Sequence, residues 1–516
     1  MASEKISLVI FVTALIARLA NAPMIVGQAG LPAGLTPLDD LYHWKRISFS
    51  AAHFPGVLEF DPDRGERGEY CPWPPLYDLS CAAVARAFGL SSIIWIPPLL
   101  GALAAGAAAF FVGRGFGSRA AIAAGVALAT SPFIVTESSV GDIDHHFLEW
   151  PLAFAILGAA CLILKNRSWI PLAIAMTLAM FVQTAMLVAC GLAFVVLFCG
   201  GQTILSVRTG KIACLPFVAT AIAIALYRVT RPPDFPNSPW FLGWPHAALF
   251  AGAAVACLLR RWPILAIAAG AAIGLAFPSA IAGGSHFFGG DPWLSTISEF
   301  QPVWKGHLDD WISHAAGFSI SAILVWDLAR RAIRDRDRVL GAIAIFALAY
   351  FPLAMSSRRF EATAIPLLAL AGAVDSAMIL RRNVAMFAAA AVALIPAVQL
   401  GLWMMHPLPP ITPEEAVWIR ASDFLRVQPP GRVLAPWSMG HCLDVLGQHP
   451  VVIDNFGTMP DRDVFERANA ALRSADLTSY CERTGVRYVI RPARPGPRFR
   501  LVYSAGSSIW ESAVGR

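Results

Sequence analysis

Long runs of apolar residues, separated by short polar links, fill the first four hundred positions of the chain. A run of about 20 apolar residues is what an α-helix needs to cross the hydrocarbon core of a bilayer. We interpret the first run as a retained helix rather than a signal peptide, because no clear small-residue cleavage site follows it. The pattern predicts thirteen transmembrane helices, at 5–26, 92–113, 118–136, 147–164, 168–184, 185–201, 211–229, 245–260, 263–282, 312–330, 339–355, 362–380 and 384–405.

The pattern changes after residue 406, where a polar region begins. Some of its segments repeat apolar residues at helical spacing and others alternate them as strands do. They predict helices at 411–426, 461–473 and 476–485, and strands at 432–436, 450–454, 486–491 and 500–505. The expected fold is an α-helical polytopic membrane protein, with a transmembrane domain over 1–406 and a small C-terminal α/β domain over 407–516.

Basic residues gather in alternate links between the predicted helices, which the positive-inside rule places in the cytoplasm. The opposite links, together with the C-terminal domain, are expected on the extracytoplasmic side. This topology depends on dividing 168–201 into two helices, since one long helix would reverse everything that follows. Arg228, Arg231, Arg358 and Arg359 lie on the extracytoplasmic side, against the rule.

Composition supports the membrane class. Only 14% of residues are charged and 57% are hydrophobic, against about 25% charged in soluble domains, and the mean hydropathy is +0.59. The net charge of +6 does not indicate a nucleic-acid partner, because no basic patch is interleaved with aromatic residues. The nine cysteines show no paired metal-binding spacing, while Cys71 with Cys81 and Cys442 with Cys481 are candidate disulfides in an oxidising compartment.

Ionisable residues are concentrated in the predicted extracytoplasmic links. The stretch "LTPLDDLYHWKRI" carries Asp39 and Asp40 soon after the first helix. These carboxylates are candidates for a site, although Asp also caps helices at a membrane surface. The stretch "GDIDHHFLEW" carries Asp144 and His146, which alternate and so point the same way in an extended loop. Carboxylate and imidazole offered to one point suit a divalent cation, and the alternative is a solvated loop.

Two later links add complementary charges. Glu299 stands in the otherwise uncharged "TISEFQP", within a long glycine-rich loop of the kind that carries function. In "SSRRFEATAIP", Arg358 and Arg359 are suited to phosphate by their bidentate geometry; the alternative is a surface charge or a headgroup contact. A metal beside an arginine stabilises the charge that develops on a phosphate-bearing leaving group.

Taken together, these stretches resemble the catalytic subunit of oligosaccharyltransferase, a family of GT-C membrane glycosyltransferases with single-subunit bacterial and archaeal members. "DDLYH" is similar to its first acidic motif, "GDIDHHFLE" to the archaeal-type G-x-x-D-x-H motif, "TISEFQP" to the TIxE motif, and "RRF" to the stretch whose arginine contacts the lipid diphosphate. The resemblance spans most of the chain. It implies Asp40, Asp144, His146 and Glu299 as ligands of Mg²⁺ or Mn²⁺, and Arg359 as the diphosphate-binding residue.

The resemblance also implies a reaction. Members of the family transfer an oligosaccharide from a polyprenyl-diphosphate carrier to an asparagine amide in an N-x-S/T sequon of an acceptor protein, with inversion. Asp40 and Glu299 would be the catalytic carboxylates that hold the amide nitrogen. A compact single-chain enzyme of this kind would lie in a prokaryotic plasma membrane, with its active site on the periplasmic side.

The acceptor-binding motif departs from the family pattern. Where the family has WWDYG, this chain has "PWSMG", which keeps Trp437 and Gly440 and places Ser438 where the carboxylate should be. Ser438 is a weaker acceptor for a sequon hydroxyl. The alternative function is therefore transfer of sugar from a polyprenyl carrier to a different acceptor, such as a Ser/Thr hydroxyl, a lipid or a glycan. A transporter would explain the helices, but its ionisable residues should lie mid-membrane rather than in loops.

Overall fold

The computed structural model of the chain describes residues 2–22, 31–35, 39–199, 207–259, 264, 291, 293–305, 308–379, 382–405 and 411–513. The chain divides into two compact units, each built from segments far apart in the sequence. Unit 1 comprises Met1–Ala20, Pro97–Ser139 and His145–Pro407. Unit 2 comprises Asn21–Ile96, Val140–Asp144 and Leu408–Arg516. The predicted domain at 407–516 is therefore grouped with two earlier segments, and the boundary at residue 406 stays a prediction.

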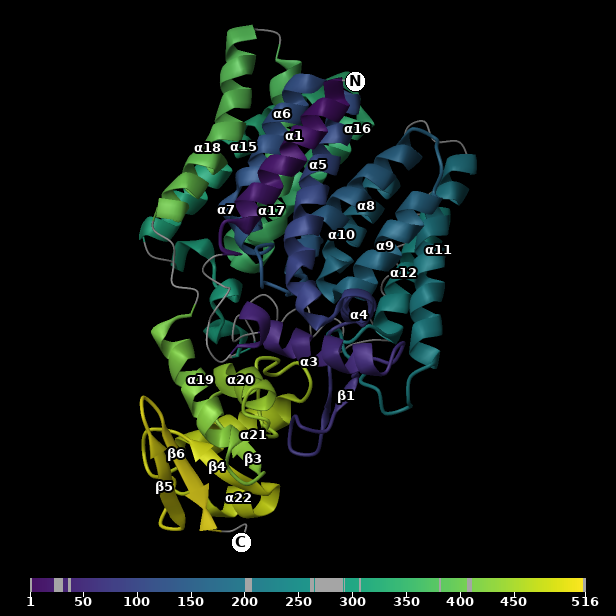
Figure 1. The fold of residues 1–516 in the computed structure, drawn as a ribbon. Coiled ribbons are helices and arrows are strands. Elements are labelled where there is room, and N and C mark those ends of the chain that lie inside the picture. Colours follow the sequence, from purple (N-terminus) through teal and green to yellow (C-terminus); the bar gives the residue numbers. More distant parts are fainter. Residues whose placement is uncertain are drawn as a thin grey trace. The chain divides into compact units, whose positions relative to one another are not determined.

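Unit 1 is helical, as the apolar runs predict (Figure 1). Every predicted run coincides with helix except 263–282, which lies outside the described residues apart from residue 264. Among the residues that the structure describes, six helices are long and apolar enough to cross a membrane. The helices are α1 (Ala2–Leu19), α5 (Ile96–Phe116), α6 (Ser118–Thr130), α7 (Pro132–Thr136), α8 (Glu149–Leu164), α9 (Ile170–Val182), α10 (Leu187–Cys199), α11 (Val207–Val229), α12 (Trp244–Leu258), α15 (Leu308–Asp335), α16 (Arg338–Ser356), α17 (Glu361–Met378) and α18 (Arg382–Met405).

The centre of unit 1 is α17, which is buried along most of its length. It packs against α6, α15, α16 and α18. Its small residues allow the neighbouring backbones to approach, as is usual between helices in lipid. A Cβ at Gly372 would lie 3.2 Å from Cγ2 of Val392 and 3.4 Å from Cδ1 of Leu324, so a larger residue there would push α18 and α15 away. The turn that precedes α17 carries Arg359.

Unit 2 begins with α3 (Asp39–Ala52), the short antiparallel pair β1 (Phe60–Asp61) and β2 (Glu69–Tyr70), and α4 (Leu76–Phe88). Its last segment starts with α19 (Pro413–Arg426), whose first turn is closed by a capping box between Thr412 and Glu415. The remaining elements are β3 (Arg432–Leu434), α20 (Gly440–Val445), α21 (Arg462–Arg473), α22 (Thr478–Thr484), β4 (Val486–Ile490), β5 (Phe499–Ser504) and β6 (Ser508–Ser512).

The four longer strands form one mixed sheet in the order β3-β4-β6-β5. β3 and β4 are parallel, and the other pairs are antiparallel. The predicted strand at 450–454 is wrong, because Val451 makes only isolated bridges, to Val433 and Arg64. Strand β6 was not predicted, since it places Glu511 in the middle of the sheet. That carboxylate is accommodated because Arg487 and Arg500 donate to it, at 3.0 and 2.7 Å.

No disulfide joins any of the nine cysteines. Neither candidate pair, Cys71 with Cys81 or Cys442 with Cys481, is therefore linked in this structure. Burial raises the pKa of Cys71 to about 11 and that of Cys442 to about 12. Both thiols are consequently protonated at neutral pH and act as packing residues.

Candidate functional site

The predicted site residues belong to both units. Unit 1 contains His146, Glu299 and Arg359, and unit 2 contains Asp40, Asp144, Trp437, Ser438 and Gly440.

In unit 1, Arg359 lies in the short 3₁₀ turn Arg358–Phe360, which joins α16 to α17. The residue is 9% exposed. Its guanidinium donates to the carboxylate of Glu149, in the first turn of α8, and lies 2.9 Å from Nδ1 of His146. His146 Nδ1 is also 3.2 Å from Glu149 Oε1. The arginine expected to bind phosphate and the histidine expected to bind metal thus share one buried carboxylate.

Glu299 approaches the same arginine from the short 3₁₀ turn Ser298–Phe300. Its Oε2 is 3.9 Å from Arg359 Nε, and the side chain is 54% exposed. Two hydrogen bonds hold its loop beside the arginine turn: the Ser357 hydroxyl donates to the Glu299 carbonyl at 3.2 Å, and the Arg358 amide donates to the Gln301 carbonyl at 3.1 Å. Three segments far apart in the sequence therefore meet within unit 1.

A small cavity of about 50 Å³ opens beside this cluster. That volume is enough for water or for part of a polar ligand. Its lining combines two arginines with three carboxylates, and consists of Phe133, Glu137, Glu299, Arg358, Arg359, Glu361 and Ala362. Sequence reasoning missed Glu149 as a partner of Arg359. The available signal was a carboxylate at the very start of a long apolar helix, where charge is costly unless it is paired.

In unit 2, Asp40 lies in the first turn of α3 and is 2% exposed. His43 follows one turn later, on the same side of the helix. Its Nδ1 is 2.5 Å from Asp78 Oδ1, and its Nε2 is 3.5 Å from Asp144 Oδ1. Burial lowers the pKa of His43, but Asp78 and Asp144 outweigh it and raise the pKa to about 9. His43 was not predicted as a site residue, although it stands inside the first acidic motif.

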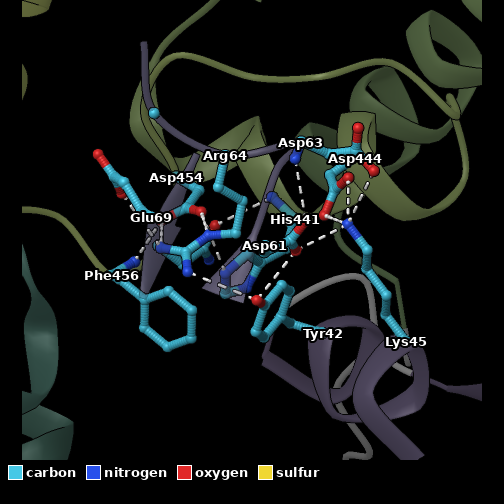
Figure 2. A network of polar contacts seen from close by, with 12 residues as sticks. Tyr42, Lys45, Asp61, Asp63, Arg64, Glu69, His441, Asp444, Asp454 and Phe456 are labelled. Carbon is cyan, nitrogen blue, oxygen red and sulfur yellow. Dashed lines mark hydrogen bonds and ion pairs between the residues drawn. The ribbon is translucent and has the colours of Figure 1, made fainter. Parts of the chain in front are cut away.

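A network of buried charges joins the early and late segments of unit 2 (Figure 2). Lys45 of α3 lies 2.8 Å from Asp61 and 2.8 Å from Asp444 of α20. Burial raises the pKa of Asp444 to about 7, although Lys45 opposes the shift. Arg64 pairs with Asp454 and lies 3.6 Å from Glu69.

Aromatic rings fill the space between these ion pairs. The ring of His441 stacks on Tyr42 with the centroids 4.9 Å apart (Figure 2). Nδ1 of His441 is 3.2 Å from Asp39. Phe456 packs edge-on against the same tyrosine and lies under the guanidinium of Arg64. His441, which follows the "PWSMG" motif, is thereby connected to Asp39, which precedes Asp40.

The "PWSMG" motif itself forms the 3₁₀ turn Trp437–Met439, followed by the first residue of α20. Trp437 and Ser438 are partly exposed, whereas Gly440 is buried. A Cβ at Gly440 would overlap the backbone of Asp454, so glycine is required there for packing. The acceptor role expected of these three residues stays a prediction.

The donor set is chemically suited to a hard divalent cation. Carboxylates such as Asp40, Asp144 and Glu299 are the oxygen ligands that Mg²⁺ and Mn²⁺ prefer, and an imidazole such as His146 is compatible with Mn²⁺. Within unit 2, the two aspartates are associated with one imidazole: Asp40 precedes His43 by one helical turn, and Asp144 contacts it. The residues therefore fit the cation that the motifs imply.

No protein-family model and no curated protein sequence matches the chain. Among solved structures, it is similar to the archaeal oligosaccharyltransferase AglB from Archaeoglobus fulgidus in complex with an inhibitory peptide and a dolichol-phosphate, with a TM-score of 0.73 and 17% identity over 95% of this chain and 69% of that one. A Zn and sulfate complex of the Archaeoglobus fulgidus oligosaccharyltransferase matches with a TM-score of 0.71 and 17% identity, over 94% and 67% of the two chains. ArnT from Cupriavidus metallidurans bound to undecaprenyl phosphate matches with a TM-score of 0.52 and 13% identity, over 98% and 96%. The chain therefore has the fold of the oligosaccharyltransferases and related GT-C membrane glycosyltransferases, which confirms at the level of fold the resemblance that its motifs predict.

Proposed function

We propose that the protein is a membrane glycosyltransferase that transfers an oligosaccharide from a polyprenyl-diphosphate carrier to asparagine side chains of acceptor proteins. The observation that carries the proposal is the cluster of Arg359, His146 and Glu299. Three motif residues, more than fifty positions apart in sequence, gather beside a polar cavity in a chain with this fold. A transporter or a purely structural membrane protein gives no reason for that convergence.

The proposed chemistry is an inverting displacement at the anomeric carbon. The bond from that carbon to the diphosphate oxygen breaks while the bond to the acceptor amide nitrogen forms on the opposite face. Asp40 and Glu299 accept hydrogen bonds from the amide N–H groups, orient the nitrogen and take up the proton that it loses. Because an amide is a poor nucleophile, such positioning must supply much of the barrier reduction.

Arg359 would bind the departing diphosphate. Its planar guanidinium can donate two parallel hydrogen bonds to phosphate oxygens. Asp40, Asp144, His146 and Glu299 are the proposed ligands of Mg²⁺ or Mn²⁺, and a bound cation would neutralise charge on the leaving group. Glu149 keeps the arginine fixed and charge-balanced before the carrier arrives.

The structural relatives support the classes of ligand. One AglB structure contains an inhibitory peptide with a dolichol-phosphate, another oligosaccharyltransferase structure contains Zn, and the ArnT structure contains undecaprenyl phosphate. By analogy, we propose a polyprenyl-linked donor, a peptide acceptor and a divalent cation for this chain. The proposed location is the plasma membrane, with the site on the periplasmic side, where the positive-inside pattern puts the motif-bearing links.

A second candidate function follows from the "PWSMG" motif. Ser438 stands where the family has the carboxylate that binds the sequon hydroxyl, and Pro436 and Met439 replace two aromatic residues. A site with those changes would favour another acceptor, such as a Ser/Thr hydroxyl, a lipid or a glycan.

The test is transfer by purified protein in lipid nanodiscs, supplied with lipid-linked oligosaccharide, Mn²⁺ and fluorescent peptides containing N-x-T, N-x-A or Q-x-T. We expect glycosylation of the N-x-T peptide only, with loss of activity after chelation and in Glu299→Gln. Equal modification of N-x-T and N-x-A would reject sequon recognition. Release of glycan from the carrier with no modified peptide would favour the second function, and activity unchanged by exhaustive chelation would reject the metal.

A further inference from the structure

Within unit 2, the five-residue segment Val140–Asp144 is hydrogen-bonded at successive points to the segment Asn21–Ile96. The Gly141 amide donates to the Ile94 carbonyl at 3.2 Å, and the Asn21 side chain donates to the Val140 carbonyl at 3.0 Å. The Tyr77 hydroxyl donates to the Ile143 carbonyl at 2.7 Å. The backbone is therefore held up to the residue before Asp144. The Asp144 carboxylate itself contacts His43, with Oδ1 3.5 Å from Nε2.

The ring of His43 is held between two aromatic side chains. The ring stacks on the indole of Trp73, with the centroids 4.0 Å apart and the planes 8° from parallel. Tyr77 packs edge-on against it at 5.3 Å. His43 is 1% exposed, so its two nitrogens have fixed directions. One faces Asp78 and the other faces Asp144.

Asp78 is in turn fixed from a second side. It is fully buried on α4, and Arg46 of α3 donates to its other carboxylate oxygen. Arg46 is also fully buried and donates to the carbonyls of Leu58 and Trp73, at 3.2 and 3.3 Å. A buried carboxylate with two such partners is a rigid anchor, because moving either partner would leave a charge unpaired in a low-dielectric interior.

We propose that His43, fixed by Asp78 and Arg46, is a positioning residue that aims the Asp144 carboxylate at the divalent cation. Consecutive residues of α4 then act on the same segment: Tyr77 holds its backbone and Asp78, through His43, holds its terminal carboxylate. The inference rests on the proposed function, since it assumes that Asp144 binds the cation. It adds the contacts from Arg46 through Asp78 to His43, which the motifs do not indicate because Asp78 lies outside all of them.

The expected effect is on metal affinity. Residues that orient a metal-binding carboxylate or imidazole change affinity or activity by about 10- to 100-fold when they are replaced. Replacing His43 should therefore weaken Mn²⁺ binding while turnover at saturating Mn²⁺ is largely retained, because Asp144 itself is still present. A side chain that keeps an N–H donor directed at Asp144 should restore part of the affinity.

The experiment measures Mn²⁺ binding to the full chain in nanodiscs by electron paramagnetic resonance of the free ion. His43→Phe should weaken binding by about 10- to 100-fold, Asp78→Asn by about 10-fold, and His43→Gln by less than His43→Phe. His53→Phe is the matched control. His53 comes directly after the same helix, is exposed, and contacts the carbonyl and the ring of Phe49 rather than a proposed metal ligand, so binding should not change. Thermal unfolding of each variant without metal shows whether unit 2 is intact. If His43→Phe does not fold, Mn²⁺ binding by Asp78→Asn tests the inference instead.

Three results would overturn the inference. If wild-type protein binds Mn²⁺ and both His43→Phe and Asp78→Asn bind it equally well, the inference fails and the proposed function stands. If loss of His43 removes a nitrogen coupling to Mn²⁺ at saturating metal, His43 is a ligand and not a positioning residue. If the wild-type protein binds no divalent cation, the metal in the proposed function fails and the inference fails with it.

Discussion

Arg359 shows how a buried arginine can be held in place for the diphosphate that we propose it binds. Its guanidinium is buried, charge-balanced by Glu149 and close to Glu299. An unpaired buried guanidinium would be very costly, so the carboxylate is needed to keep it in place. The fork geometry of arginine leaves further N–H groups for a phosphate beyond those used by Glu149. The same pairing gives Arg359 a physical reason to stand in a link where the positive-inside rule predicts few basic residues.

At the residue scale, we expect Arg359→Lys to keep the positive charge but lose the bidentate geometry. Losing one charged hydrogen bond of about 2 kcal/mol corresponds to roughly a 30-fold loss in kcat/KM for the lipid-linked donor. The loss should be smaller for the peptide acceptor, which Arg359 does not touch in the proposed mechanism. Steady-state kinetics with each substrate varied in turn would measure this. Equal kcat/KM for Arg359→Lys and wild type would remove the arginine from the diphosphate site.

At the scale of elements, the β1–β2 pair and α3 are joined to α20 and the loop at 451–456 by buried charges as well as by aromatic rings (Figure 2). Such pairs add little net stability, because desolvation offsets much of the Coulomb attraction. Their arrangement is uneven: Arg64 faces both Asp454 and Glu69. The single positive charge of Arg64 cannot balance two buried carboxylates. Burial raises the pKa of Glu69 to about 8 despite Arg64.

We accordingly expect Glu69→Gln to change the pH dependence of stability. A carboxyl with a pKa of about 8 when folded, against about 4.5 when unfolded, favours folding at low pH and loses that contribution as the pH rises to about 8. Glutamine does not titrate, so the free energy that this side chain contributes to folding does not change over this pH range. The variant should therefore gain on wild type between pH 5.5 and pH 8.5, by roughly 3 kcal/mol at most. Melting temperatures of both proteins at the two pH values measure the gain, and a constant difference would contradict it.

At the scale of the whole molecule, both units interleave segments that are distant along the chain. Unit 2 needs its early segments as well as its last one. The Val451 amide donates to the Asp63 carbonyl at 2.8 Å, and Lys45 and Arg64 supply the cations for Asp444 and Asp454. The late segment alone would lack the cations that pair with these two carboxylates.

We therefore expect the fragment 408–516, expressed alone, to lack a cooperative fold. Leaving a buried charge unpaired costs about 3–5 kcal/mol, and two such charges approach the whole stability of a small domain, about 5–15 kcal/mol. Dispersion of backbone amide resonances and a thermal melt of the purified fragment measure this, with the full chain in detergent as the reference. A fragment with a sharp melt and dispersed resonances would show instead that the boundary predicted at residue 406 separates an independent domain.

The sequence by itself determined the membrane class, the positions of the described helices in unit 1 and the resemblance to the oligosaccharyltransferases. These depend on local quantities, namely the length of apolar runs and the order of short motifs, which can be read without knowing what touches what. The convergence of His146, Glu299 and Arg359 was expected from the motifs, but only the tertiary structure located their contacts.

The tertiary structure alone decided Glu149 as the partner of Arg359, the chain from Arg46 through Asp78 and His43 to Asp144, and the strand that contains Glu511. In each case a charged side chain is buried at a position where sequence patterns expect an apolar residue or a solvated one. Its cost is offset by a partner many residues away, as Glu149 is by Arg359. A pattern of neighbours along the chain cannot contain that information, because the stabilising charge is brought near only when the chain has folded.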